Sequence, residues 1–132
     1  MSDAAGAVQA GLVAALKGHA PLYDAVSGVF DGPPARAGFP YVAIGESVSG
    51  DWSSKTTRGR EHGLAIIIWD DGQSTGRLHR LMAEAETAIE AMPAVLDGHR
   101  LAGLSFVRSR VRRDPVGPWS GVVEYRARTV EV

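Results

Sequence analysis

The side chains that could do acid–base or metal chemistry are few and lie far apart in this sequence. The four histidines are His19, His62, His79 and His99. None stands at a metal-binding spacing such as His-Glu-x-x-His, and none has an acidic or imidazole partner at ligand spacing. The chain has no cysteine, which excludes disulfides, thiolate metal sites and cysteine nucleophiles. These residues therefore predict no metal site and no histidine-based catalytic centre.

A second candidate for chemistry is the acidic segment Asp70-Asp71-Gly72, whose carboxylates are potential cation ligands. No further carboxylates cluster near it in the sequence, so a turn that leads into a negatively charged helix start is the favoured interpretation. Residues 72–77 combine hydroxyls with a helix start but lack the Lys-Ser/Thr ending of a phosphate-binding loop. No Gly-x-Ser-x-Gly nucleophile elbow occurs. We therefore predict no catalytic residue, no metal and no cofactor.

Binding chemistry has stronger candidates, beginning with a tryptophan in a long polar segment. Trp52 lies in residues 46–60, a predicted loop rich in hydroxyls and positive charges, and long polar loops inside small domains are usually functional. Trp119 lies in a second predicted loop, and aromatic residues in such places are enriched at interfaces. The alternative for both is that the ring folds back over its own core. The predicted subunit or tube interface consists of Trp52, Lys55, Arg58, Arg60, Trp69 and Trp119.

The second binding candidate is a set of arginines that alternate with other residues near the C-terminus. If residues 99–112 and 121–131 pair as a hairpin, five arginines and Glu124 share one sheet face. This arginine face consists of Arg108, Arg110, Arg112, Arg126 and Arg128. Residues 1–98 hold seven Lys/Arg and twelve Asp/Glu, whereas residues 99–132 hold seven arginines and three Asp/Glu, which is typical of a polarised surface. The alternative is that these arginines occupy solvent-facing strand positions without a binding role.

The hydrophobic pattern predicts the elements that position these candidates. Helical spacing predicts a helix over residues 3–17, with Ser2 or Asp3 as its N-cap, and a second from Ser74 as N-cap to Met92. Strands are predicted over residues 29–30, 39–45, 60–69, 99–112 and 121–131, with a turn at 114–118 between the last two. Leu104 and Phe106 interrupt the alternation, which indicates a bulge or a partly covered face.

The predicted strand 60–69 is apolar on both of its faces, because Leu64, Ile66 and Ile68 alternate with Ala65, Ile67 and Trp69. Such a strand needs cover on both sides, and a partner subunit is one way for a small chain to supply it. The order helix, strands, helix, strands predicts an α+β fold, with a mainly antiparallel sheet and two helices packed on one face. The 132 residues fit one domain over residues 1–132.

Bulk composition is that of a globular protein rather than a disordered one, with 45% hydrophobic and 22% charged residues. No apolar run approaches the ~20 residues of a membrane span, so no membrane association is expected. The N-terminus lacks the basic and apolar regions of a secretory signal, which makes synthesis in the cytoplasm the expectation.

Several short motifs follow one another through nearly the whole chain. They are Leu16-Lys17-Gly18-His19-Ala20-Pro21-Leu22, Phe39-Pro40-Tyr41-Val42, Asp51-Trp52-Ser53-Ser54-Lys55-Thr56, Gly59-x-Glu61-His62, Ile66-x-Ile68-Trp69, Gly98-His99-Arg100-Leu101, Arg112-Arg113-Asp114-Pro115 and Trp119-x-Gly121-Val122-Val123-x-Tyr125-Arg126. In their order and spacing, these motifs resemble the tail-completion or tail-terminator family of long-tailed bacteriophages and of prophage-like gene transfer agents. The turn at 70–72 differs from the turn residues of that family.

This resemblance implies a non-enzymatic α+β subunit that forms a hexameric ring on the head-proximal end of a finished tail tube. The ring would stop polymerisation of the tube protein and present a surface to the head–tail connector or stopper protein. DNA would pass through it without sequence specificity. The protein would be assembled in the bacterial cytoplasm and end in the tail neck of a virion or phage-like particle. We expect the arginine face to serve mainly subunit or tube contacts, because arginines on a DNA channel would hold the phosphate backbone.

Two other classes of function stay open on the sequence. One is a different head–tail joining protein of the neck, with a related sheet-and-helix fold. The other is a small enzyme or ligand-binding module, which would require a deep pocket with convergent polar groups in the monomer.

Overall fold

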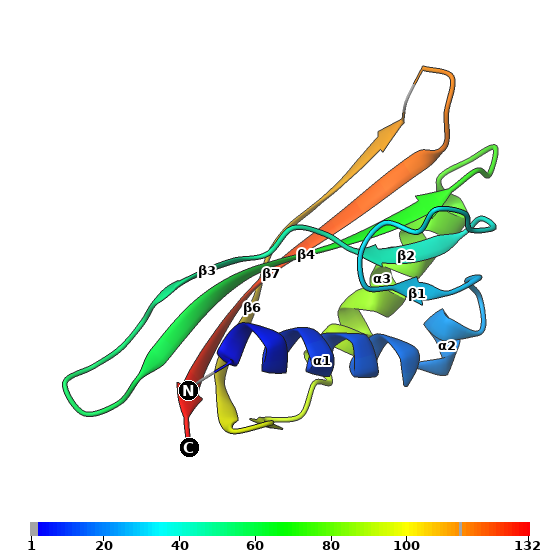
Figure 1. Ribbon diagram of the computed structural model, residues 1–132. Coiled ribbons are helices and arrows are strands. Elements are labelled where there is room, and N and C mark those ends of the chain that lie inside the picture. Colours follow the sequence, from blue (N-terminus) through cyan, green and yellow to red (C-terminus); the bar gives the residue numbers. More distant parts are fainter. Residues whose placement is uncertain (1–2, 114) are drawn as a thin grey trace.

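A computed structural model of the protein describes residues 3–113 and 115–132. The elements in chain order are α1 (Ala4–Lys17), α2 (Ala20–Tyr23), β1 (Val29–Phe30), β2 (Tyr41–Ile44), β3 (Val48–Asp51), β4 (Gly59–Asp70), α3 (Gly76–Glu90), β5 (Val95–Leu96), β6 (His99–Arg113) and β7 (Trp119–Glu131). The strands form one sheet with the order β1-β2-β4-β7-β6-β5, and β3 pairs with β4. Figure 1 shows this sheet curled, with the helices on one of its faces.

The predicted α+β class is confirmed. All strand pairs are antiparallel except β1 with β2, and the helices cover one sheet face (Figure 1). The short helix α2, which has Pro21 in its first turn, was not predicted. Within the described ranges, no helix is both long enough and apolar enough to cross a membrane.

The two long helices begin in different ways. Asp3 caps α1 as predicted, because its Oδ1 accepts a hydrogen bond from the Gly6 backbone N–H at 2.9 Å; Ser2, the other candidate, lies outside the described residues. The predicted Ser74 cap of α3 is wrong. The N-cap is Thr75, whose side chain makes no capping bond, and the first turn of α3 is instead tied to the sheet by an ion pair described below. The helix ends at Glu90 rather than Met92.

The core lies between the helices and the helix-facing side of β4 and β7. Side chains on this side alternate with those on the opposite side, as strand geometry requires. The fully buried contributors include Leu12, Leu16, Leu78, Ile89, Ile66, Ile68, Val123 and Tyr125. The opposite side, which we call the open face, carries Ala65, Ile67 and Trp69, which are half-buried. The prediction that β4 is apolar on both faces is therefore confirmed.

The predicted loop 46–60 is wrong at residues 48–51 and at its end, where β4 already begins at Gly59. Residues 48–51 form strand β3, which pairs with residues 60–63 of β4. Val-Ser-Gly-Asp has little strand propensity of its own, so β3 owes its conformation to the neighbouring strand. The resulting β3–β4 hairpin extends past the end of the helix layer (Figure 1). We call residues 48–63 the arm.

The β6–β7 hairpin extends from the other end of the sheet (Figure 1). Its register shifts between Leu101 and Gly103 and again between Phe106 and Arg108. The predicted bulge is therefore confirmed, and Phe106 packs edge-on against Tyr125 with ring centroids 5.7 Å apart while staying 47% exposed. Of the predicted turn 114–118, Asp114 lies outside the described residues.

Candidate assembly surfaces

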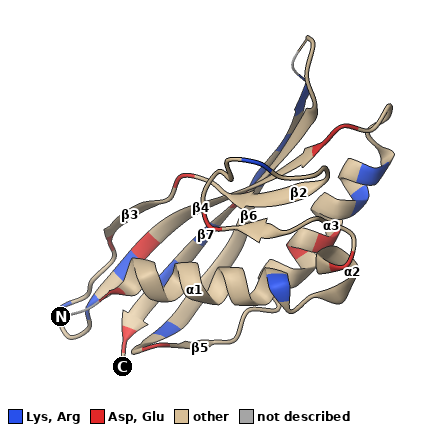
Figure 2. Ribbon diagram, turned by 45° about the vertical axis from the view of Figure 1, so that its right-hand side comes forward, with Lys and Arg blue, Asp and Glu red and all other residues tan. Residues whose placement is uncertain are grey.

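The structure brings the five arginines of the arginine face together on the open face. Arg108 is paired in register with Glu124, Arg110 with Val122 and Arg112 with Ser120. Arg126 and Arg128 follow Glu124 at two-residue spacing along β7, so their side chains leave the sheet on the same side. Figure 2 shows these basic positions recurring along the long strands. Their placement agrees with the sequence, whereas their role stays a prediction.

Three of these arginines are engaged by carboxylates on the same face. Arg108 Nε lies 2.5 Å from Glu124 Oε2, and Arg128 Nε lies 2.8 Å from Glu61 Oε2. Arg126 Nε is 3.7 Å from the other oxygen of Glu61. These contacts cross from β6 to β7 and from β7 to β4. These two carboxylates offset two of the five positive charges of the arginine face, and such exposed pairs contribute little to stability.

The remaining two arginines, Arg110 and Arg112, have no ion pair with any of the described residues and are exposed. Both lie in the part of β6 that leads to the hairpin tip. The uncompensated positive charge of the open face is therefore concentrated near the β6–β7 tip rather than spread over the whole face.

Trp52 connects the arm to the arginine face. Its backbone N–H donates a hydrogen bond to the Gly59 carbonyl at 2.9 Å, which continues the hairpin beyond β3. The Arg128 guanidinium lies over its indole ring, 5.1 Å from the ring centroid, and the residue is 40% exposed. Lys55, Arg58 and Arg60 are exposed along the same arm. The structure thus gathers four of the six predicted interface residues on the arm.

The other two predicted interface residues, Trp69 and Trp119, occupy different surroundings. Trp69 is half-buried on the open face, in register with Tyr41. Trp119 packs against the protein's own core, donates its Nε1–H to the Gly72 carbonyl at 3.2 Å and lies under the Arg113 guanidinium at 4.9 Å. Trp119 therefore has the position of a core cover, which was the alternative weighed for it.

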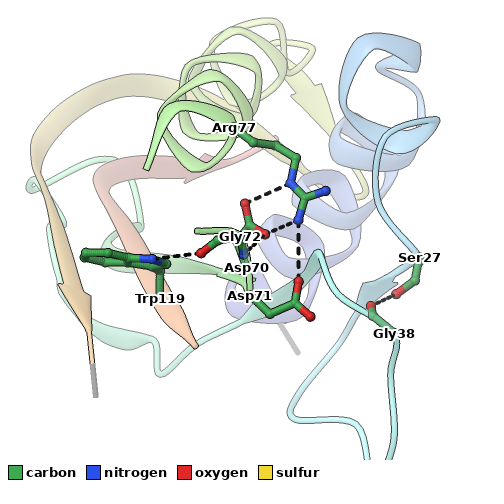
Figure 3. A network of polar contacts seen from close by, with 7 residues as sticks. All are labelled: Ser27, Gly38, Asp70, Asp71, Gly72, Arg77 and Trp119. Carbon is green, nitrogen blue, oxygen red and sulfur yellow. Dashed lines mark hydrogen bonds and ion pairs between the residues drawn. The ribbon is translucent and has the colours of Figure 1, made fainter. Parts of the chain in front are cut away.

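The turn after β4 holds a buried ion pair that the sequence did not predict. Asp70 is fully buried, and both of its carboxylate oxygens contact the Arg77 guanidinium, with Nε 3.0 Å from Oδ2 (Figure 3). The Gly72 backbone N–H also donates to Asp70 Oδ1 at 3.1 Å. Hydrogen bonding from Arg77 lowers the pKa of Asp70 against the opposing effect of burial. The ion pair fixes the start of α3 to the end of β4.

The predicted break in the chain is correct from Asp71 onward, whereas Asp70 is the last residue of β4. Both acidic side chains have a structural role. Asp71 Oδ1 lies 3.5 Å from Arg77 Nη2, so both carboxylates face one arginine side chain rather than a metal-binding site. No cluster of three or more metal-ligand side chains occurs among residues 3–113 and 115–132. Nearby, Ser27 Oγ donates to the Gly38 carbonyl and closes the loop before β2 (Figure 3).

His62 joins three strands at the base of the arm. Its Nδ1 lies 2.8 Å from Ser49 Oγ on β3, and its Nε2 lies 2.9 Å from Thr129 Oγ1 on β7. The residue is 1% exposed. Burial, followed by the charges of Arg60 and His99, lowers the pKa of His62 below its ordinary value of 6.5. No sequence pattern indicated this bridge, because it depends on three strands meeting.

The lowered pKa of His62 predicts a pH-dependent stability. The folded state holds the imidazole neutral, whereas the unfolded chain protonates it near its ordinary pKa, so the unfolded state binds more protons. The free energy of unfolding should therefore decrease as the pH falls from about 8 to about 5. Urea denaturation across this range measures the dependence. His62→Gln should be less stable at the higher pH and lose less stability on acidification, whereas exposed His79→Gln should keep the wild-type slope.

These features define the class of protein: a small α+β domain with long projecting hairpins and one sheet face left open. A solved structure described as "Virion of native gene transfer agent (GTA) particle" contains a chain with a TM-score of 0.73 and 28% sequence identity, covering 98% of this chain and 99% of that chain. The structure of the bacteriophage SPP1 gp17 protein has a TM-score of 0.66 and 23% identity, covering 94% of this chain and 89% of the other. At that identity the second likeness shows the fold alone.

The family described as Tail completion protein gp17 matches residues 10–130. The chain belongs to this family and is a structural protein of phage-type tails. No curated protein matches it in sequence. The resemblance found in the sequence is thereby confirmed.

Proposed function

We propose that the protein is a tail terminator. Six copies form a ring at the head-proximal end of the tail tube, in the neck of a virion or phage-like particle. The ring ends polymerisation of the tube protein, binds the head–tail connector or stopper protein and lets DNA pass without reading its sequence. In this role the chain acts through its surfaces, as one domain over residues 1–132, and not as an enzyme. Membership of the tail completion family supports the general role.

The observation that carries the proposal is the open face. Ile67 and Trp69 on this face are half-buried within the monomer, and the described helices lie on the other face of the sheet (Figure 1). Apolar surface of this kind beside polar residues is typical of contact sites between proteins. The adjoining arm presents Trp52, Lys55, Arg58 and Arg60 at the end of the sheet. We assign the arm and the open face to contacts with neighbouring subunits and with the tube.

The ion pairs favour protein contacts over DNA contacts for most of the arginine face. Arg108, Arg126 and Arg128 already face Glu124 or Glu61. DNA phosphates would compete with these carboxylates and would be repelled by them. Contact with DNA is therefore secondary, and it would be non-specific where it occurs.

Particles assembled without this protein test the proposal. Tail tubes longer than wild type would support a terminator, and adding the protein back should restore the normal length. Tubes of normal length that fail to attach to heads would instead identify a head–tail joining protein. The mass of the purified protein in solution is the second measurement. A strict monomer at every concentration, with and without tail tubes, would contradict a ring.

Reversing charge on the arginine face should impair assembly. The Arg126→Glu/Arg128→Glu variant places two new carboxylates beside Glu61. It also removes the Arg128 guanidinium that lies over the Trp52 ring. We expect the fraction of protein in rings to fall about tenfold, as repulsion between like charges at interfaces costs several kcal/mol. The matched control Lys17→Glu/Arg80→Glu changes net charge equally at exposed positions of α1 and α3 in the helix layer. Unchanged ring formation and tail length in the first variant would remove the arginine face from the contact.

A further inference from the structure

An apolar pocket lies at the β2 edge of the open face. Its volume is about 480 Å³, and it is formed where the loop after β1 approaches the open side of β2 and β4. Pro33 and Pro34 of the loop, Tyr41 of β2, and Ile67 and Trp69 of β4 line it. The pocket therefore includes Trp69, one of the predicted interface residues, and offers apolar side chains from the loop and from both strands.

The rim of this pocket is acidic. Asp31 and Glu46 belong to its lining and are both exposed. Asp31 accepts a hydrogen bond from the neutral Gln9 side chain, and neither carboxylate forms an ion pair with any residue in the described ranges. A ligand for this pocket should thus combine an apolar centre with flanking positive charge.

The tip of the β6–β7 hairpin has these properties. Val116 is 101% exposed and lies between Pro115 and Pro118. These prolines add apolar surface to the turn, and their fixed φ angles restrict its conformations. Arg110 and Arg112 lead into the tip on the open-face side without carboxylate partners among the described residues. Over residues 110–118 the sequence has three arginines and one aspartate, Asp114, so the tip segment carries net positive charge.

In one molecule, the pocket and the tip are separated by the two central strands of the sheet. The order β2-β4-β7-β6 places the pocket strand β2 and the tip strand β6 on either side of the central pair. Figure 1 shows the hairpin pointing away from the sheet rather than folding back over it. Two complementary patches at different places on one molecule make a head-to-tail contact, and such contacts close into rings when the rotation allows.

We propose that the Val116 tip of one copy of this chain inserts into the apolar pocket of the next copy. Val116 and its flanking prolines contact Tyr41, Ile67 and Trp69, while Arg110 and Arg112 face Asp31 and Glu46. This contact rests on the proposed ring, for which it supplies the subunit-to-subunit surface. The second copy is the occupant because the chain carries both complementary patches.

Engineered cysteines test the contact, since the natural chain has none. Purified Val116→Cys and Glu46→Cys proteins are mixed with or without tail tubes, oxidised mildly and resolved by mass. A mixed disulfide dimer is the expected product. Val95→Cys, at a 72% exposed valine on β5, replaces Val116→Cys in the control and should give no such product.

A charge exchange supplies an independent readout. Arg112→Glu and Glu46→Arg should each raise the protein concentration needed for half-assembly about fivefold, and their combination in one chain should return it to within about twofold of wild type. Val116→Asp should prevent assembly without changing monomer stability, because the residue is fully exposed in the monomer.

The outcomes separate this contact from the proposed function. Oligomers of the expected mass that neither form the mixed disulfide nor respond to Val116→Asp would overturn the contact and leave the ring intact. Disulfides between two Val116→Cys chains alone would indicate a tip-to-tip contact and also overturn it. A monomer under all conditions would overturn the ring together with this contact.

Discussion

Replacing Arg77 with alanine should lower the free energy of unfolding by about 3 kcal/mol, the lower end of the range for removing one partner of a buried ion pair. The Asp70 carboxylate is fully buried, and the Arg77 guanidinium compensates most of its negative charge. Because the Arg77 side chain is 45% exposed, water can enter part of the space that the substitution leaves and solvate the carboxylate. Urea denaturation at neutral pH measures the loss. Exposed Arg80→Ala, one turn further along α3, should change stability by less than about 0.5 kcal/mol.

The pH dependence of this loss identifies its cause. Because Arg77 lowers the pKa of Asp70, the stabilisation is complete above the ordinary aspartate pKa of 3.8 and disappears as the pH falls through the lower folded value. In the variant, Asp70 can take up a proton more readily. The stability difference between wild type and Arg77→Ala should therefore be large at neutral pH and shrink in acid. A difference that stays constant would indicate lost packing rather than lost charge compensation.

Trp52→Ala should weaken assembly about 30-fold while leaving the monomer folded. A tryptophan at the centre of an interface is worth about 2 kcal/mol or more when truncated, and each 1.4 kcal/mol is tenfold in affinity. In the monomer, the substitution removes a contact with Arg128, which at an exposed site is worth about 0.5–1 kcal/mol. Sedimentation measures assembly, and circular dichroism with thermal melting measures the fold.

Tyr23→Ala is the matched control for Trp52→Ala. Tyr23 is also an aromatic residue with 40% exposure, but it lies on α2 in the helix layer. Tyr23→Ala should lower the stability of the monomer by the same amount as Trp52→Ala or by less, and it should leave assembly unchanged. If Trp52→Ala instead unfolds the monomer, Trp52 is a cover for its own hairpin, which was the alternative for this residue.

The sequence predicted the parts of the fold that repeat a simple period. The alternation of Arg108, Arg110 and Arg112 placed these residues on one face with Arg126 and Arg128, and the register confirms it. The interruption at Leu104 and Phe106 correctly indicated a bulge. Five strands and both long helices were predicted within a few residues of their observed bounds. Periodicity succeeds here because each of these elements has a buried side that selects its side chains.

The parts that the sequence did not predict depend on contacts distant in the chain. Strand β3 has four exposed residues, so no apolar period marks it, and it exists because β4 lies alongside. Asp70 looked like an ordinary turn residue, and its burial follows from Arg77 reaching back from α3. His62 is neutral and enclosed because Ser49 and Thr129 belong to two other strands. Glu124 was predicted on the arginine face, whereas Glu61, which faces Arg126 and Arg128 from the neighbouring strand β4, was not.

The continuity of β4 and β7 has a mechanical consequence. Strand β4 runs from the arm through the core to the end that carries the β6–β7 hairpin, and β7 pairs with it over its whole length. With 12 residues at about 3.4 Å per residue, β4 is about 40 Å long. Tension along it would load the interstrand hydrogen bonds in shear, all together, because these bonds lie perpendicular to the strands. A pull on the arm is therefore transmitted to the far hairpin without peeling the sheet apart one bond at a time.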